Sequence, residues 1–314
     1  MPLIRAATRS SPLARWQTEY VASLLSASGS FVESVFVDTL GDRTQAIGTP
    51  LHNLGGQGVF VKEVQSAVLR GDADIAVHSA KDLPSTTADG LVLAGVPIRG
   101  DVRDALIGST LARLRHGARV GTSSVRRRAQ LLSIRPDLDV VSIRGNVGTR
   151  INRVGEFDAV VLAAVPLERL AILDQLSTRF PVEFLSVDVM LPMVAQGAIA
   201  VECRDDDVET RSMLAAITDS QTLREVSAER AYLAELGGGC DLPVGALATR
   251  APSAPRSAAG SPEGPLTMRV LIASLDGTSI VRAEGQGTDP LALGRSLACE
   301  VLDGGGRALL DARG

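Results

Sequence analysis

Short apolar segments and amphipathic segments alternate along most of the chain, and this alternation constrains the fold more than any other feature. Residues 3–7 have the pattern of a buried strand, and helical periodicity follows as far as residue 27. A strand pattern at 31–40, a helical pattern at 60–70 and a strand pattern at 73–78 continue the series. Strands interleaved with helices predict an α/β fold, with parallel or mixed sheets that carry helices on both faces.

A second set of similar elements lies between residues 103 and 191, and connectors containing Gly and Pro flank it at 94–97 and 191–197. This arrangement suits a second domain inserted into the first, with two crossing segments as a hinge and a ligand cleft between the domains. We therefore expect two α/β domains and a small C-terminal domain. The expected boundaries are 1–97 with 192–217 for domain 1, 98–191 for domain 2 and 218–314 for domain 3.

The third region has the pattern of a small α+β domain. A helix is predicted over 222–235, and three glycines then precede Cys240. A low-complexity loop at 251–265 lies between two predicted strands. Asp276-Gly277 predicts a hairpin turn. Asp289-Pro290 predicts the start of a last helix that runs to about residue 302, because Pro is favoured in a first helical turn.

Composition narrows the class of protein. The 314 residues are enough for two or three domains. No apolar run approaches the ~18 residues of a membrane span, and residues 1–8 lack the features of a signal peptide, so we expect a cytoplasmic protein. The net charge of −4 argues against nucleic-acid binding. Three widely spaced cysteines form neither a disulfide framework nor a zinc pattern, so no metal is expected.

Hydroxyl and arginine side chains recur where a predicted strand passes into a helix. Thr8-Arg9-Ser10-Ser11 is the first such loop and Thr122-Ser123-Ser124-Val125-Arg126-Arg127 is the second. Helix N-termini present unpaired N–H groups, and guanidinium groups bind carboxylates or phosphates in a bidentate manner. Each loop alone is also explained by ordinary helix capping with solvated arginines. Their recurrence, with Arg144 and Arg150 after another strand, favours a shared anion site.

Two single residues are candidates for the chemistry. Asp82 follows the predicted strand 73–78, and ligands of open α/β sheets bind at the carboxyl ends of strands. It could act as a general acid or base or stabilise a developing cation, although a surface Lys81–Asp82 pair before a turn fits the spacing equally well. Cys240 follows open glycine backbone, which gives a reactive thiol the access it needs, although the spacing alone fits an inert thiol equally well. Cys203 and Cys299 fit inert packing.

Several motifs in fixed order closely resemble the porphobilinogen deaminase family. They cover essentially the whole chain, and the set is specific to that family. The motifs are Ala7-Thr8-Arg9-Ser10-Ser11-Pro12-Leu13-Ala14-Arg15-Trp16-Gln17, His78-Ser79-Ala80-Lys81-Asp82-Leu83-Pro84, Gly121-Thr122-Ser123-Ser124-Val125-Arg126-Arg127, Ile143-Arg144-Gly145-Asn146-Val147-Gly148-Thr149-Arg150, Gln196-Gly197-Ala198 and Gly238-Gly239-Cys240.

The resemblance implies a cytoplasmic, monomeric transferase of tetrapyrrole and heme biosynthesis, with two domains like type II periplasmic binding proteins. It implies a dipyrromethane cofactor on Cys240, head-to-tail condensation of four porphobilinogen molecules with loss of ammonia, and release of linear hydroxymethylbilane by water. Asp82 matches the family's catalytic carboxylate. Residues matching its carboxylate-binding groups are Arg9, Ser11, Lys81, Thr122, Ser124, Arg126, Arg127, Arg144, Arg150 and Arg169, with Gln17, Asn146 and Gln196 as supporting polar contacts.

The chain departs from the family pattern at a few positions. Gln57 and Asn53 stand where the Gly-rich loop over the cleft has lysines, and Val165-Pro166 replaces small residues before Arg169. Two alternatives follow from these residues and from the shared architecture. One is a non-catalytic anion-binding protein such as a transport receptor or sensor, and the other is a deaminase homologue with altered substrate handling. The absence of a signal peptide and the presence of Cys240 argue against the receptor.

Overall fold

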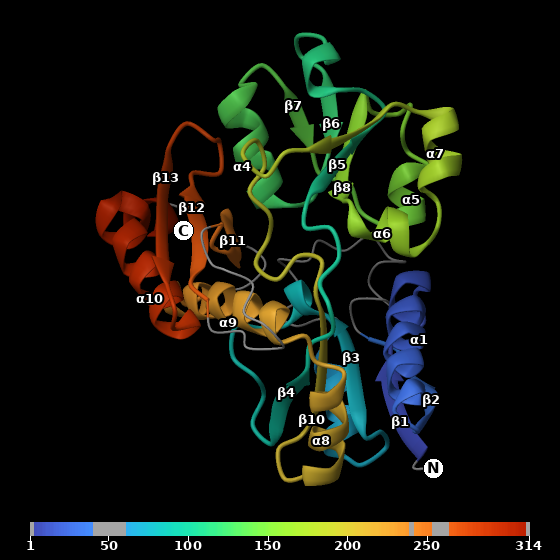
Figure 1. Cartoon of the computed structure of the whole chain (residues 1–314). Helices are drawn as coiled ribbons and strands as arrows, with labels where there is room; N and C mark the ends of the chain where they lie inside the picture. Colours follow the sequence, from blue (N-terminus) through green and yellow to red (C-terminus); the bar gives the residue numbers. More distant parts are fainter. Residues whose placement is uncertain (1–2, 40–60, 239–241, 253–263, 312–314) are drawn as a thin grey trace. The chain divides into compact units, whose positions relative to one another are not determined.

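A computed structural model describes residues 3–39, 61–238, 242–252 and 264–311 (Figure 1). The chain divides into two compact units. Unit 1 is Met1–Gly100 with Gly197–Leu223, and unit 2 is Asp101–Gln196 with Arg224–Gly314. Unit 2 therefore combines most of the predicted domain 2 with most of the predicted domain 3. The three-domain boundaries stay a prediction. Gln57 and Asn53 lie outside the described residues.

Unit 1 is built on a five-stranded sheet with the order β2-β1-β3-β10-β4. β1 pairs in parallel with β2 and β3, while β10 runs antiparallel to β3 and β4. Its strands are β1 (Leu3–Thr8), β2 (Phe31–Phe36), β3 (Ile75–Ser79), β4 (Leu91–Gly95) and β10 (Ile199–Arg204). Its helices are α1 (Pro12–Ala27), α3 (Lys62–Leu69) and α8 (Val208–Ala216), and a single 3₁₀ turn, η2 (Ala80–Asp82), follows β3.

Helices cover both faces of this sheet. Val21 and Leu25 of α1 and Leu214 of α8 pack against the odd-numbered residues Ile75 and Val77 of β3. On the other face, α3 packs against Ala7, Ala73 and Ala76. Alternate residues of a strand point to opposite faces, so both faces of the central strands are apolar and buried.

Unit 2 repeats the same sheet plan, with the order β7-β6-β8-β5-β9. β6 pairs in parallel with β7 and β8, while β5 runs antiparallel to β8 and β9. Its strands are β5 (Asp104–Ile107), β6 (Arg119–Gly121), β7 (Asp139–Val141), β8 (Ala159–Ala163) and β9 (Val182–Leu185). Its helices are α4 (Val125–Ile134), α5 (Val147–Ile151), α6 (Val165–Arg169) and α7 (Leu173–Arg179), and η3 (Leu111–Arg113) is a short 3₁₀ turn.

Core side chains show that α4 covers one face of this second sheet and that α5, α6 and α7 cover the other. The predicted α/β class, with mixed sheets and helices on both faces, is therefore confirmed. β5 and β9 were not predicted from the sequence. They pair antiparallel with each other, and β5 also with β8, between segments far apart in the sequence, so no local pattern encodes the pairing.

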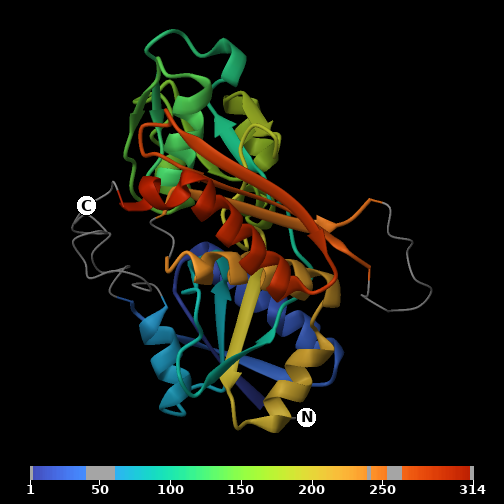
Figure 2. The same ribbon diagram turned by 90° about the vertical axis from the view of Figure 1, so that its left-hand side faces the viewer.

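The remainder of unit 2 contains a three-stranded antiparallel sheet, β11-β12-β13. Helix α10 lies along this sheet (Figure 2). The predicted turn at Asp276-Gly277 connects β12 to β13, so the hairpin is confirmed. The elements are α9 (Ser220–Glu235), β11 (Val244–Arg250), β12 (Leu266–Ala273), β13 (Ile280–Gly287), α10 (Pro290–Val301), the turn η4 (Leu302–Gly306) and α11 (Arg307–Asp311). Helix α9 begins in unit 1 and continues in unit 2.

Candidate active site

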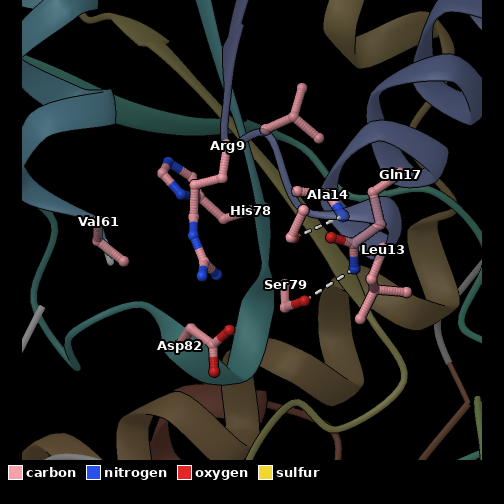
Figure 3. Close-up of a pocket in the computed structure, with 10 residues that line it drawn as sticks. Arg9, Leu13, Ala14, Gln17, Val61, His78, Ser79 and Asp82 are labelled. Atoms are coloured by element: carbon pink, nitrogen blue, oxygen red, sulfur yellow. Dashed lines mark hydrogen bonds between the residues drawn. The ribbon is translucent and has the colours of Figure 1, made fainter. Parts of the chain in front are cut away.

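A small polar pocket lies at the carboxyl ends of β1 and β3 in unit 1 (Figure 3). These two strands are parallel neighbours, with Ala7 opposite Ala76, so the segments that follow them meet at one edge of the sheet. The pocket holds about 60 Å³. Its polar lining is Arg9, Ser11, Gln17, His78, Ser79 and Asp82.

Hydrogen bonds fix the hydroxyl and amide groups of this pocket. Ser11 caps α1, because its Oγ accepts from the backbone N–H of Ala14 at 3.3 Å. Gln17, one turn into the helix, donates from Nε2 to Ser79 Oγ at 2.8 Å. Figure 3 draws both bonds as dashed lines. The start of α1 and the end of β3 are thereby held in one arrangement.

Asp82 and Arg9 enter the pocket from different segments, and their charged ends face each other across it in Figure 3. Asp82 ends the turn η2 and is half-buried, as is Lys81 beside it. A carboxylate that keeps some exposure next to a cation can bind an N–H donor and exchange protons with a ligand. The structure thus brings together four predicted residues, namely Arg9, Ser11, Gln17 and Asp82.

A buried acid that was not predicted from the sequence lies behind this pocket. Glu202 of β10 is 1% exposed, and its Oε2 lies 3.2 Å from Nε2 of His78 and accepts from Gln65 Nε2 at 2.9 Å. A buried carboxylate needs hydrogen bonds or a counter-charge. Gln65 donates one hydrogen bond to Oε2 and His78 lies beside the same oxygen, while Oε1 has no hydrogen-bond partner in the described part of the chain. Glu202 interrupts an otherwise apolar strand, Ile199 to Cys203, and that interruption was an available clue.

In unit 2 the predicted polar residues gather at the starts of α4 and α5. Ser124 caps α4 by accepting from the N–H of Arg127, and Thr122 Oγ1 accepts from the N–H of Ser124 at 3.3 Å. Asn146 caps α5 by accepting from the N–H of Thr149 at 2.9 Å. These three side chains therefore serve the local backbone, as the ordinary capping hypothesis expected. Capping leaves the remaining lone pairs and N–H groups at each helix start for a ligand.

Arg126 and Arg127 share a buried acid that the sequence did not indicate. Asp104 opens β5 and is fully buried. Its Oδ2 accepts from Arg126 Nη2 at 2.8 Å, and its Oδ1 accepts from Arg127 Nε at 3.0 Å. Gln196 Nε2 also donates to Oδ1, at 3.0 Å. Burial would raise the pKa of Asp104, but the two guanidinium groups outweigh it and lower that pKa to about 2.

The other predicted arginines differ in exposure. Arg144 and Arg150 follow β7 and are half-buried, and Arg150 Nε donates to the carbonyl of Gly145 at 2.7 Å. Gly145 has a φ of 117°, and a Cβ there would lie 2.6 Å from that of Thr149, so the loop requires glycine. Arg169, at the end of α6, is 9% exposed.

Two of the three cysteines lie in the described part of the chain, and they differ in burial. Cys240 lies outside the described residues, so its surroundings stay a prediction. Cys203 packs in the core of unit 1, where burial raises the pKa of its thiol to about 11. Such a thiol is inert at neutral pH, as the sequence predicted. The same prediction was wrong for Cys299, which does not pack in a core but is exposed on α10, because its position falls on the outer face of that helix.

Comparisons with known proteins identify the family. The family model described as "Porphobilinogen deaminase, dipyromethane cofactor binding domain" matches residues 4–212, and the one described as "Porphobilinogen deaminase, C-terminal domain" matches residues 223–303. The porphobilinogen deaminase of Acidithiobacillus ferrooxidans (strain ATCC 53993 / BNL-5-31) is 43% identical over 98% of this chain and 97% of its own length. The chain belongs to the porphobilinogen deaminase family.

A second relative, the porphobilinogen deaminase of Syntrophotalea carbinolica, is 42% identical over 96% of this chain and 91% of its own length. Among solved structures, a periplasmic substrate-binding protein of an ABC transporter from Coxiella burnetii is similar with a TM-score of 0.42 and 15% identity, over 72% of this chain and 96% of that one. Membership makes this chain a transferase of tetrapyrrole biosynthesis whose N-terminal part is a dipyrromethane cofactor-binding domain.

In the described part of the chain, no helix combines the length and the apolar character that crossing a membrane requires. The same residues contain no group of three or more His, Cys, Asp or Glu side chains placed to hold a metal ion.

Proposed function

We propose that this porphobilinogen deaminase homologue is a hydroxymethylbilane synthase in which Asp82 is the catalytic carboxylate and Cys240 carries the cofactor. The chain joins four porphobilinogen molecules head to tail, releases ammonia at each addition, and frees linear hydroxymethylbilane by hydrolysis. The observation that carries the assignment of Asp82 is its position in one pocket with Arg9 and Ser11.

The chemistry of this pocket fits a dipyrromethane and the pyrroles added to it. Pyrrole rings offer an N–H donor, and their acetate and propionate substituents need cations and hydroxyls. Asp82 supplies the acceptor, while Arg9 and Ser11 supply the cation and the hydroxyl. When bound through Cys240, the cofactor supplies the pyrrole terminus to which the first substrate unit is added.

Asp82 has two tasks in this proposal. Positive charge develops on the pyrrole of porphobilinogen as its C–N bond breaks, and a fixed carboxylate beside the pyrrole N–H stabilises that charge. Each addition also transfers a proton, because a pyrrole carbon loses one as the new C–C bond forms and the departing amine takes one up. A carboxyl group with some solvent exposure can give a proton to the departing amine and then take up the proton that the pyrrole carbon loses.

The arginine and hydroxyl groups hold the substituents of the growing chain. Each pyrrole brings two carboxylates, and a hydrogen bond to a charged group contributes about 1.5–3 kcal/mol. We propose the predicted set for this role, with Arg9, Ser11 and Lys81 in unit 1 and the remainder in unit 2. The remainder are Thr122, Ser124, Arg126, Arg127, Arg144, Arg150 and Arg169, supported by Gln17 of unit 1 and by Asn146 and Gln196 of unit 2.

We further propose that the chain works as a monomer in the cytoplasm, without a nucleic-acid or membrane partner. The net charge of −4 supports the exclusion of nucleic acid. Light scattering on the purified protein measures the molecular mass in solution. A mass near 32.8 kDa agrees with a monomer, and a multiple of it would contradict this part of the proposal.

Replacing Asp82 tests the catalytic assignment. Asp82→Asn keeps the shape of the side chain but removes its charge and its capacity to accept a proton. We expect turnover of porphobilinogen to fall by about 10²–10⁴-fold, while binding of porphobilinogen stays measurable, because the carboxylate-binding groups are unchanged. Asp82→Ala should lose at least as much.

Asp89→Asn provides the matched control, because Asp89 is exposed and lies outside the pocket in the same unit. The control should turn over porphobilinogen at the rate of the unsubstituted protein. Near-normal turnover in Asp82→Asn would remove Asp82 from its catalytic role.

A further inference from the structure

Asp104 fixes the orientation of the Arg127 guanidinium group by binding the edge that Nε and Nη2 form. Arg127 Nε lies 3.0 Å from Asp104 Oδ1, and Nη2 lies 2.9 Å from the same oxygen. Arg127 Nη1 donates to the carbonyl of Val161, on β8, at 3.3 Å. A guanidinium carries five N–H groups, so these contacts leave one N–H on each terminal nitrogen without an acceptor in the described part of the chain.

The two arginines bound to Asp104 differ in access. The side chain of Arg126 is 1% exposed, and that of Arg127 is 7% exposed. Arg126 Nη1 donates to the carbonyl of Leu191 at 2.7 Å, which ties the start of α4 to the 191–196 segment. Arg127 is therefore the member of the pair whose guanidinium group lies nearer the surface.

Hydrogen bonds from neighbouring segments fix the position of the Asp104 carboxylate. Gln196 Nε2 donates to Asp104 Oδ1 and also to the carbonyl of Val102, at 2.7 Å. Gln130 of α4 bonds both the N–H and the carbonyl of Leu191, at 2.8 and 3.0 Å. The carboxylate is thus held by α4 and by the segments at both ends of the 101–196 stretch.

The charges of this cluster do not cancel. Two buried guanidinium groups meet one buried carboxylate, and the lowered pKa of Asp104 keeps it ionised at neutral pH. One positive charge is left over, and a buried charge without a counter-charge is costly. A ligand carboxylate at the two remaining N–H groups of Arg127 would balance it.

We propose that Asp104 is a positioning residue for the reaction, which holds Arg127 by one edge so that its two remaining N–H groups receive a carboxylate of the growing pyrrole chain. The proposal rests on the proposed function, since it assumes that Arg127 binds such a carboxylate. It adds that the fixed position of Asp104, and not only its negative charge, determines how well Arg127 binds.

Asp104→Glu separates position from charge. The variant keeps one negative charge beside both arginines but displaces the carboxylate by one methylene. We expect kcat/KM for porphobilinogen to fall by about tenfold or more, because misplacing a binding group by ~1 Å is costly in catalysis. Asp139→Glu is the matched control, since Asp139 is a half-exposed partner of Arg119 in the same unit, and it should keep the kcat/KM of the unsubstituted protein.

A double-mutant cycle then identifies the partner through which Asp104 acts. In an Arg127→Gln background, Asp104→Glu should cause no further loss of kcat/KM, because the group that it positions is absent. Intact mass shows cofactor loading in each variant, and urea unfolding shows folding. An unsubstituted chain without cofactor or turnover would instead refute the proposed function itself.

Three results would overturn the inference about Asp104. The first is an Asp104→Glu protein with normal kcat/KM, which would mean that charge alone suffices. The second is losses that multiply in the double variant, which would mean that Asp104 acts independently of Arg127. The third is an Asp104→Glu chain that does not fold, which would assign Asp104 to the fold alone.

Discussion

The charge of Asp104 is tied to the folded state of the chain. Its pKa falls from 3.8 to about 2 on folding, although burial alone would raise it, because Arg126 and Arg127 flank the carboxylate. A carboxyl group with a lowered pKa in the folded state stabilises the fold above its unfolded pKa. That contribution is lost as the pH falls from about 4 to about 2.

Acid unfolding tests this residue. The free energy of unfolding, measured with urea between pH 5 and pH 2, should fall more steeply for the unsubstituted protein than for Asp104→Asn. The difference across the window should be on the order of 2 kcal/mol. Other carboxylates with lowered pKa values, such as Asp74 and Asp158, titrate in both proteins and cancel in the comparison. Parallel curves would show that Asp104 does not titrate in this window.

The hydroxyl and arginine residues at the strand-to-helix loops were predictable from the sequence, but the side chains that they contact were not. The sequence pattern correctly predicted that Ser11, Ser124 and Arg127 lie at helix starts. The bond from Arg127 to Asp104 joins residues 23 positions apart on different elements, and no local pattern encodes it. A charged residue that opens an apolar strand, as Asp104 does before Ala105, was the available clue.

At the scale of elements, the close crossing of α9 and α10 depends on a glycine. A Cβ added at Gly294 of α10 would lie 2.1 Å from the carbonyl oxygen of Ala228 and 2.9 Å from the N–H nitrogen of Tyr232, both on α9. These are backbone atoms and cannot turn away as a side chain can. The helices would have to separate along their whole contact.

Gly294→Ala should therefore lower the free energy of unfolding by about 1–3 kcal/mol, although alanine favours helix more than glycine does. Gly148→Ala is the control in another helix, because the nearest atom to its added Cβ lies 3.5 Å away. That variant should be neutral or slightly more stable. Equal effects of the two substitutions in urea unfolding would refute the crowding argument.

Helices were easier to predict than strands for a physical reason. The starts of α1 and α10 were evident, because Ser11-Pro12 and Asp289-Pro290 combine a capping side chain with a proline in the first turn. The antiparallel strands β5 and β10 depend on pairing with residues far along the chain. Their direction in the sheet was therefore not encoded locally.

At the scale of the whole molecule, the two five-stranded sheets share one plan. In each, three parallel strands are followed by an antiparallel strand and then an edge strand, although the strands come from different parts of the sequence. The alternation of strands and helices predicted two such α/β halves. The composition of the compact units and the pairing order come from long-range contacts, which only the structure supplies.

The central claim is that the chain builds a pyrrole polymer on a cofactor attached to Cys240, and intact-mass analysis of the denatured protein tests it most directly. We predict that the unsubstituted protein carries an adduct of two pyrrole units and that Cys299→Ser keeps it, while Cys240→Ser lacks both adduct and turnover. A fully active, unmodified chain would contradict the claim.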